Sequence, residues 1–233
     1  MTRWVYDRSG INHIKVNQKW YKMRIGIVAV IYEEPEYQET LKCLMQLDYP
    51  VEYVDRQGVG SLAQAYNQGF DRITQKWDLD GIWLVSNITF EVSDFERLRQ
   101  CLIDGWDAVH PAFESDHQHI RPNDHGGKRR TGTREVKFLE FTAPMINRYV
   151  FEAVRLNEKM PYWGHDLDWS YRAKQEGAKL GVCYDASVGH VYIRNNLVHP
   201  ITRQRMSNRK RTDNQTTREL RRIYGANWRK LLY

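Results

Sequence analysis

Two carboxylates and a histidine gather within four residues of the sequence PYWGHDLDWSYR, residues 161–172. They are His165, Asp166 and Asp168. The following residues predict a helix over 166–176, and both acids fall at or near its start, where the helix dipole stabilises negative charge. A carboxylate held there could act as a general base, although one of the two could instead cap the helix. Because two acids and a histidine exceed what a cap requires, we expect a reactive site here.

A second group of polar residues follows the ends of predicted strands. Asp55 ends one strand before a glycine-containing turn, and Ser86, Asn87 and Thr89 follow another. Open α/β sheets bind ligands beyond the carboxyl ends of their strands. Asp55 could therefore accept hydrogen bonds from a base or ribose; the alternative is that it only initiates a turn. His190, in VGHVY, lies near a further strand end, where a lone histidine is more often part of the core.

Alternating strands and helices must position these residues. Apolar runs predict buried strands at 23–32 and 81–85, a short strand is expected at 51–55, and 107–112 is expected to be extended. Apolar residues at helical spacing predict helices at 35–47, 62–73 and 95–103. This order predicts an α/β fold with a mixed, mainly parallel sheet flanked by helices.

The second half of the chain is less regular. It predicts a strand at 136–141, helices at 147–156 and 166–176, strands at 180–184 and 187–192, and a helix near 214–224. Gly177 is expected to end the second of these helices. We expect an N-terminal extension over 1–22, one domain over 23–195, and a basic tail over 196–233.

Cysteine use and hydropathy exclude several classes of protein. The 233 residues include three widely spaced cysteines, an odd number that argues against a disulfide framework and a cysteine-based zinc site. No apolar run reaches the roughly 18 residues of a transmembrane helix, and the first residues lack a signal-peptide stretch. We therefore expect a cytoplasmic protein.

Positive charge is concentrated near the C-terminus. From Arg194 to Tyr233, eleven basic residues oppose two acids, a net charge of +9 that leaves −3 for the rest of the chain. A polar segment, 114–135, adds further basic residues and three histidines, but without cysteines it is a poor zinc site. The asymmetry suggests a polyanionic partner; the alternative is a solvated tail. The candidate contacts are Lys128, Arg129, Arg130, Arg209, Lys210 and Arg211.

Four stretches, in order, resemble the family 2 glycosyltransferases, which are inverting enzymes with the GT-A fold. RIGIVAVIYEEP resembles the first strand of that family, and VDRQGVGSLAQAYNQGF resembles its second strand and A-x-A-x-N-x-G helix. FLEFTAPMINRYVF is similar to the acceptor-side strand and helix. WGHDLDWSYRAKQEGAKLGVCYDASVGHVY is similar to the helix with the ED-x-D motif, the next strand and a later histidine. The resemblance covers about residues 23–195.

The resemblance implies a role for individual residues. Asp166 matches the general base that deprotonates the acceptor hydroxyl, and Asp168 lies in the same motif. Asp55 matches the acid that faces the uracil or ribose, and His190 matches a histidine that reaches the metal or the diphosphate. The implied donor-binding residues are Tyr32, Glu33, Asp55, Asn67, Ser86, Asn87 and Thr89.

The sequence departs from the family pattern at two motifs. The acidic motif that usually holds Mg²⁺ or Mn²⁺ is replaced by Ser86-Asn87-Ile88-Thr89, which contains no carboxylate. A weaker metal site from Asn87, Thr89 and His190 is one possibility, and neutralisation of the diphosphate by cationic side chains is another. His165 replaces the usual glutamate, where it could contact a phosphate or the acceptor.

These features predict a nucleotide-sugar-dependent inverting glycosyltransferase, with a UDP-sugar as the expected donor. The basic tail and the lack of a membrane element favour DNA carrying a hydroxylated pyrimidine, the acceptor of phage-type DNA-modifying transferases. Tyr162 and Trp163 could then stack on a flipped base. One alternative is a cytoplasmic transferase acting on a glycan or lipid-linked sugar, with the tail on anionic headgroups. Another is an inactive sugar- or nucleotide-binding module.

Overall fold

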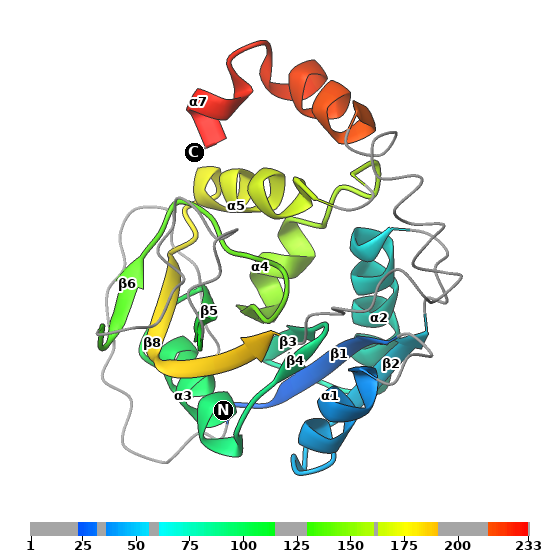
Figure 1. The fold of residues 1–233 in the computed structure, drawn as a ribbon, viewed down its shortest axis with the longest axis vertical. Coiled ribbons are helices and arrows are strands. Elements are labelled where there is room, and N and C mark those ends of the chain that lie inside the picture. Colours follow the sequence, from blue (N-terminus) through cyan, green and yellow to red (C-terminus); the bar gives the residue numbers. More distant parts are fainter. Residues whose placement is uncertain are drawn as a thin grey trace.

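Apolar strands build a mixed sheet, and helices cover both of its faces (Figure 1). The computed structural model describes residues 23–31, 36–55, 61–114, 130–160, 163–190 and 214–232. The strands in these ranges are β1 (Ile25–Ile31), β2 (Val51–Asp55), β3 (Gly81–Val85), β4 (Ile88–Thr89), β5 (Ala108–Phe113), β6 (Thr133–Glu135), β7 (Met145–Asn147) and β8 (Leu180–His190). The helices are α1 (Glu36–Leu44), α2 (Leu62–Lys76), α3 (Val92–Ile103), α4 (Arg148–Ala153), α5 (His165–Gln175), α7 (Trp228–Leu232) and an unlabelled helix over 214–224.

The described strands form one eight-stranded sheet in the order β2-β1-β3-β7-β5-β8-β4, with β6 also paired to β8. β1 runs parallel to β2 and β3, and β5 runs parallel to β8. The short β7 lies antiparallel between β3 and β5. β4 and β6 are antiparallel to β8. The predicted α/β class with a mixed sheet is confirmed.

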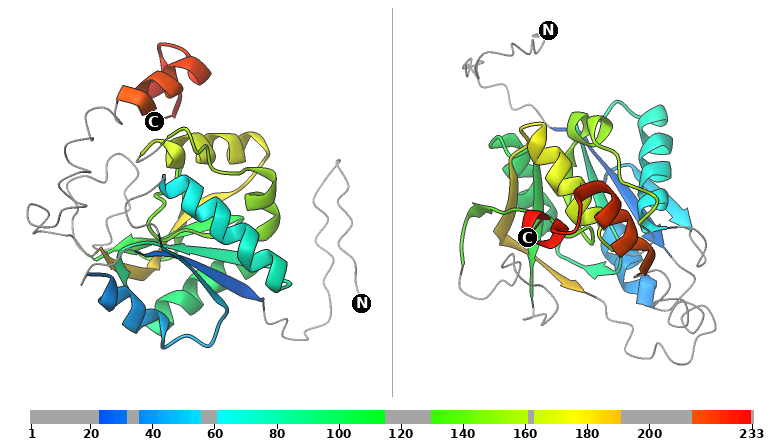
Figure 2. Two further views of the ribbon diagram at one scale, coloured as in Figure 1. Left: turned by 90° about the vertical axis from the view of Figure 1, so that its right-hand side faces the viewer. Right: turned by 90° about the horizontal axis from the view of Figure 1, so that it is seen from above.

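Two apolar layers sandwich the sheet (Figure 2). Side chains of β1 alternate between them: Ile25 and Ile27 pack with α1 and α3, whereas Val28 and Val30 pack with α2, α4 and α5. The alternation follows from the two-residue period of a strand. Gly69 lets α2 approach β1 closely, since a Cβ there would lie 2.2 Å from Cγ1 of Val28. The glycine of the A-x-A-x-N-x-G sequence therefore has a packing role.

The predicted strand at 136–141 is wrong. The strand is β6, which ends at Glu135, and 136–141 has no regular structure. Phe138, Leu139 and Phe141 are buried, but they pack against helices, and the amide of Leu139 donates to Oγ of Ser170 on α5 (3.0 Å). The apolar pattern therefore reflects burial under α5 rather than strand pairing.

The boundaries of the other predicted elements differ less from those in the structure. The strands predicted at 180–184 and 187–192 are one strand, β8, whose pairing with β5 shifts register between Pro111 and Ala112. β7 occupies the residues just before the helix predicted at 147–156, which begins at Arg148. The helix predicted near 214–224 is present, and α7 follows it.

The C-terminal helices pack on α5 (Figure 1). Leu220, Trp228 and Leu232 join Met160 and Leu167 in an apolar cluster. A solvated tail is therefore not the structure of residues 214–232, although Arg209, Lys210 and Arg211 lie outside the described residues. None of the described helices is both long and apolar enough to cross a membrane.

Candidate active site

The carboxyl ends of β1, β2 and β3 bring three of the predicted donor-binding residues, Asp55, Ser86 and Asn87, to one edge of the sheet. Ile31 pairs with Asp55, and Val85, two residues short of Asn87, pairs with Ala29. Asp55 is exposed at this edge, and Ser86 is nearly buried. The arrangement is the one that binds ligands in open α/β sheets. Tyr32 and Glu33 lie outside the described residues.

Asn87 has an unusual conformation. Its φ of 53° is left-handed, and its side-chain oxygen is buried without a hydrogen-bond partner among the described residues. A buried carbonyl oxygen without a partner costs free energy, and a non-glycine residue at positive φ adds strain. Such features concentrate at ligand sites, so the geometry favours Asn87 as a ligand-binding residue.

The corner next to Asn87 contains a carboxylate that the sequence reasoning missed. A Cβ on Gly189 would lie 2.4 Å from Oγ1 of Thr89 and 3.2 Å from Oε2 of Glu114, so both oxygens line the space that this glycine leaves open. Glu114 follows β5, far from the expected motif in sequence. The position of His190 pairs with Ile88 in the same corner, but its side chain is not described.

Oxygens of these kinds suit a divalent cation such as Mg²⁺ or Mn²⁺. Oγ1 of Thr89 and Oε2 of Glu114 line one space beside Gly189, and the side-chain oxygen of Asn87, two residues before Thr89, has no hydrogen-bond partner among the described residues. Within the described ranges, no three His, Cys, Asp or Glu side chains form a metal cluster, so one carboxylate would act with neutral ligands.

Asn67 makes hydrogen bonds within the chain. Its side chain is buried and donates to the carbonyl of Leu156 (3.0 Å) and to Oε1 of Glu158 (2.9 Å), while its oxygen accepts from the amide of Leu156 (3.2 Å). These bonds use both donors of the amide and one acceptor site of its oxygen. Asn67 therefore fixes the segment after α4, which leads toward α5.

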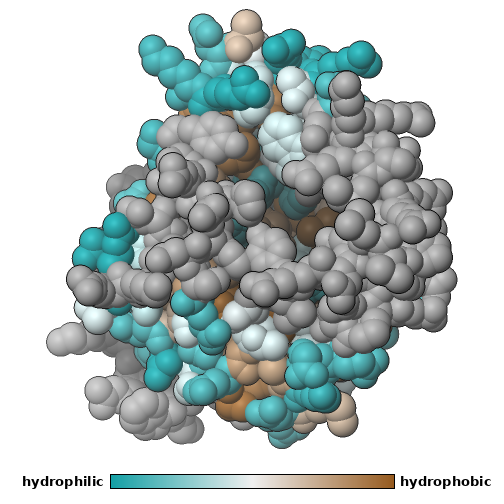
Figure 3. Space-filling model, in the orientation of Figure 1, coloured by the Kyte–Doolittle hydropathy of each residue, from teal (hydrophilic) through white to brown (hydrophobic). Residues whose placement is uncertain are grey.

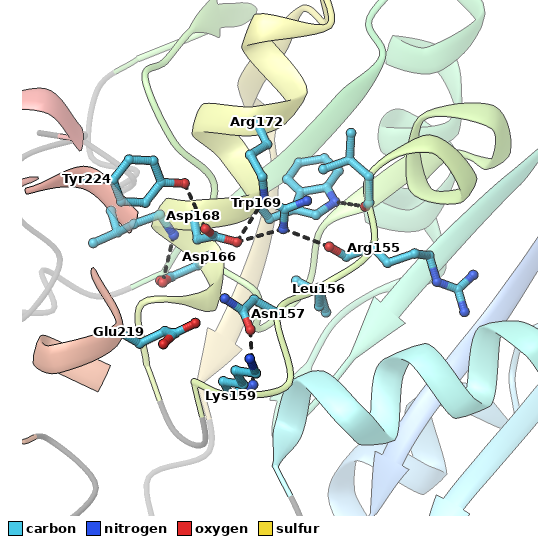
Figure 4. Close-up of polar contacts among 12 residues, drawn as sticks. Arg155, Leu156, Asn157, Lys159, Asp166, Asp168, Trp169, Arg172, Glu219 and Tyr224 are labelled. Atoms are coloured by element: carbon cyan, nitrogen blue, oxygen red, sulfur yellow. Dashed lines mark hydrogen bonds and ion pairs between the residues drawn. The ribbon is translucent and has the colours of Figure 1, made fainter. Parts of the chain in front are cut away.

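The first turn of α5 presents Asp166 (Figure 4). Gly164 caps the helix with a φ of 84°, and a Cβ there would lie 2.7 Å from Cγ2 of Thr216 on the C-terminal helix. Glycine is thus required by both conformation and packing. Asp166 is half-buried, and one carboxylate oxygen accepts from the amide of Leu167 (2.9 Å).

Asp168 points away from Asp166 and is an anchor (Figure 4). Its carboxylate is buried and accepts from Nε (3.0 Å) and Nη2 (2.6 Å) of Arg172 and from the hydroxyl of Tyr224 (2.7 Å). Burial and this hydrogen bond raise the pKa of Tyr224, which keeps the phenol a donor. Arg172 also donates to the carbonyl of Arg155 (2.7 Å). Asp168 therefore joins α5 to the C-terminal helix and to the end of α4.

His165 is also buried. Its ring packs edge-on to Phe141, with centroids 6.1 Å apart. His165 therefore lies in the interior, at the first turn of α5, and not at the surface. Trp163 is half-buried beside Trp228, with ring centroids 6.1 Å apart.

The remaining predicted acceptor contacts are only partly described. Arg130 donates to the hydroxyl of Tyr184 (3.0 Å) at the β6–β8 edge. Tyr162, Lys128 and Arg129 lie outside the described residues.

One segment, 139–142, connects the strand ends with α5. The amide of Ser86 donates to the carbonyl of Thr142 (2.9 Å), while Leu139 binds Ser170 and Phe141 contacts His165. The hydroxyl of Tyr66 on α2 holds the carbonyl of Phe141 (3.1 Å). Glu140 lies in this segment, half-buried, and sequence reasoning missed it because it sits in an apolar run. Burial and the charge of Asp166 raise the pKa of Glu140 to about 8.

Neither a family model nor a curated protein matches the sequence. Solved structures match its fold. Protein A197 from STIV aligns with a TM-score of 0.54 at 14% identity, over 71% of this chain and 83% of its own. S. aureus TarS 1-349 aligns with a TM-score of 0.55 at 13% identity, over 72% of this chain and 60% of that one.

A structure of GalNAc-T7 with UDP, GalNAc and Mn²⁺ aligns with a TM-score of 0.52 at 13% identity, over 73% of this chain and 44% of that one. This chain thus spans less than two thirds of the TarS and GalNAc-T7 chains that it matches. At these identities the likeness shows the fold, which is GT-A-like.

The anchoring role of Asp168 predicts a loss of stability on substitution. Asp168→Asn should lower the free energy of unfolding by about 1–3 kcal/mol, because it removes the charge that Arg172 pairs with. Tyr224→Phe, which deletes only the hydroxyl, should lower it less. Urea denaturation measures both, with exposed Asp104→Asn as the matched control. An Asp168→Asn protein as stable as that control would show that the network is not an anchor.

Proposed function

We propose that this protein is a nucleotide-sugar-dependent, inverting glycosyltransferase with Asp166 as its general base. The observation that carries the proposal is the placement of Asp166. Its half-buried carboxylate sits on the first turn of α5, and segment 139–142 ties that turn to the strand end at Ser86. A base and a ligand-binding sheet edge are thus held in one rigid frame.

A UDP-sugar is the donor we favour. Asp55 stands exposed at the carboxyl edge, where a carboxylate accepts hydrogen bonds from a ribose or a base. The fold neighbour GalNAc-T7 holds UDP, GalNAc and Mn²⁺. In this chain, Asn87, Thr89 and Glu114 would hold a divalent cation, which would neutralise the leaving diphosphate.

The proposed reaction requires one general base, Asp166. Asp166 takes the proton of the acceptor hydroxyl, whose oxygen forms a bond to the anomeric carbon. The bond from that carbon to the diphosphate oxygen breaks, and the nucleoside diphosphate leaves with the electron pair. Because attack comes from the face opposite the leaving group, one displacement inverts the anomeric configuration.

The acceptor we favour is DNA that carries a hydroxylated pyrimidine. The support is the net charge of +9 over residues 194–233. On the face shown in Figure 3, most exposed side chains at the C-terminal helices are hydrophilic. Arg218 and Arg221 are exposed there, whereas Arg222 pairs with Glu219 (2.8 Å). DNA binding by basic side chains is governed by phosphate contacts.

The proposal is tested by incubating the protein with several UDP-sugars, with and without hydroxymethylated DNA, and following products by mass spectrometry. A hexose added to DNA supports the proposal in full. Transfer only to glycans or lipid-linked sugars would support the glycosyltransferase activity and contradict DNA as the acceptor. Donor binding without turnover on any acceptor would contradict the proposed enzymatic activity and support an inactive binding module.

Asp166→Asn should lower turnover by about 10²–10⁴-fold, because the amide cannot accept the hydroxyl proton. Donor affinity should stay nearly unchanged, since the base acts on the acceptor. Initial rates and donor calorimetry measure the two effects, and exposed Asp48→Asn is the matched control. Near-normal turnover in Asp166→Asn would remove it from the role of base.

The DNA acceptor predicts salt-dependent binding. The affinity of the wild-type protein for duplex DNA should fall with salt, with a log–log slope of about −0.9 per phosphate neutralised. A variant in which Arg209, Lys210 and Arg211 are replaced by Gln should bind all sequences more weakly, with a shallower slope and unchanged donor affinity. Fluorescence anisotropy at several salt concentrations measures this. The tail would be excluded as a DNA contact if the DNA affinity of the wild type did not change with salt concentration. The same would follow if the triple variant bound DNA as tightly as the wild type.

A further inference from the structure

Hydrogen bonds hold the chain on both sides of Asn87. On one side, the amide of Ser86 donates to the carbonyl of Thr142 (2.9 Å). On the other side, the hydroxyl of Thr40 on α1 donates to the carbonyl of Ile88 (2.8 Å), and Thr40 is buried. A left-handed conformation at a non-glycine residue persists only where the surrounding structure imposes it. The two bonds are therefore placed to impose the φ of 53° at Asn87.

Thr142 belongs to a short segment, 142–144, that lies between β3 and β5, as the following β7 does. On the β3 side, the amides of Leu84 and Ser86 donate to the carbonyls of Pro144 (3.0 Å) and Thr142. The position of this segment therefore sets the position of the end of β3, from which the chain passes directly to Asn87.

His110 on β5 holds the other side of the segment. Its ring is fully buried and packs against Phe113, with centroids 5.1 Å apart. Its Nδ1 is hydrogen-bonded to the carbonyl of Pro111, and its Nε2 lies 2.9 Å from Oγ1 of Thr142. Because a carbonyl only accepts, Nδ1 carries a proton, and Nε2 of the neutral ring accepts from the Thr142 hydroxyl. The ring thus fixes the side chain of Thr142, whose backbone binds Ser86.

We propose that His110 and Thr40 are positioning residues of the donor site, which hold Asn87 in the left-handed conformation that binds the diphosphate of the donor with its divalent cation. His110 acts through Thr142, and Thr40 acts directly on the carbonyl of Ile88. This inference rests on the proposed function, because it takes the strand ends as the donor site. His110 and Thr40 are 0% and 1% exposed, so they act through these contacts and not on the donor itself. A site already held in its binding conformation spends less free energy on ordering when the ligand arrives.

Calorimetry with UDP in the presence of Mn²⁺ tests the contribution of His110. His110→Phe keeps a ring without nitrogens, and Thr142→Val keeps the side-chain shape without the hydroxyl. Each should weaken UDP binding about three- to tenfold. His110→Gln keeps an acceptor and Thr142→Ser keeps the donor, so both should bind UDP within about twofold of wild type. Because His110→Phe and Thr142→Val break the same hydrogen bond, the double variant should lose no more affinity than the weaker-binding single variant.

The same titration tests Thr40. Thr40→Val removes the hydroxyl that holds Ile88 and should also weaken UDP binding about three- to tenfold. Thr74→Val is the matched control, because the Thr74 hydroxyl donates to the carbonyl of Phe70 (2.7 Å) within α2. This control loses a hydrogen bond of the same kind, so its free energy of unfolding should fall, whereas its UDP affinity should equal that of the wild type.

Amide hydrogen exchange tests the positioning without a ligand. The Ser86 amide should exchange about tenfold or more faster in His110→Phe and Thr142→Val than in the wild type and in Thr74→Val. Equal exchange at Ser86 in these proteins would overturn the role of His110.

Two calorimetric results would overturn the proposal while leaving the proposed function intact. One is a UDP affinity that is the same in the wild type, His110→Phe and Thr40→Val. The other is a loss of affinity in Thr74→Val as large as in those variants, which would show a general loss of stability. A wild type that does not bind UDP would instead contradict the proposed donor site, and the exchange at Ser86 would still decide whether His110 holds this part of the chain.

Discussion

The buried carboxylate of Asp168 must be neutralised where it lies, and the neighbouring structure is organised around that requirement. A charge taken out of water is tolerated only when it is paired and hydrogen-bonded. Arg172, one turn along α5, supplies the charge, and Tyr224 of the C-terminal helix supplies a further donor. Because Arg172 also binds the carbonyl of Arg155, one carboxylate fixes α5 against two other parts of the chain.

This anchoring also fixes the position of Asp166, the proposed base. With α5 held through Asp168, its first turn begins at Gly164, where the C-terminal helix packs so closely that no side chain fits. Segment 139–142 then links the same turn to Ser86 at the end of β3. The Asp166 carboxylate and the carboxyl edge of the sheet are thereby joined by short, buried contacts, the kind of preorganisation that the proposed catalysis would require. The C-terminal helices take part in these contacts, although their amino-acid composition predicts only a basic tail.

Sequence reasoning was reliable where local pattern determines structure. The run at 81–85 matches β3, because a strand buried on both faces is uniformly apolar. The run at 51–55 matches β2, an edge strand in which only Val54 is buried. Sequence reasoning failed where contacts between distant parts of the chain determine the structure. The residues around Leu139 are apolar because α5 covers them, and nothing local distinguishes that from a strand. Glu114 and Glu140 belong to no motif and reach the site only through folding. Asp166 and Asp168 look alike in the sequence, and only the partners that Asp168 finds on other elements separate an anchor from a base.

Binding of UDP, measured by calorimetry, tests the central claim most directly, because it requires neither the sugar nor the acceptor to be known. The account predicts that UDP binds one site per chain, that Asp55→Ala weakens this binding by the roughly 0.5–1.5 kcal/mol of a directed hydrogen bond, or more if charged, and that Asp166→Asn leaves it unchanged. A protein that does not bind UDP, or that binds it equally well after Asp55→Ala, would contradict a donor site at the ends of these strands.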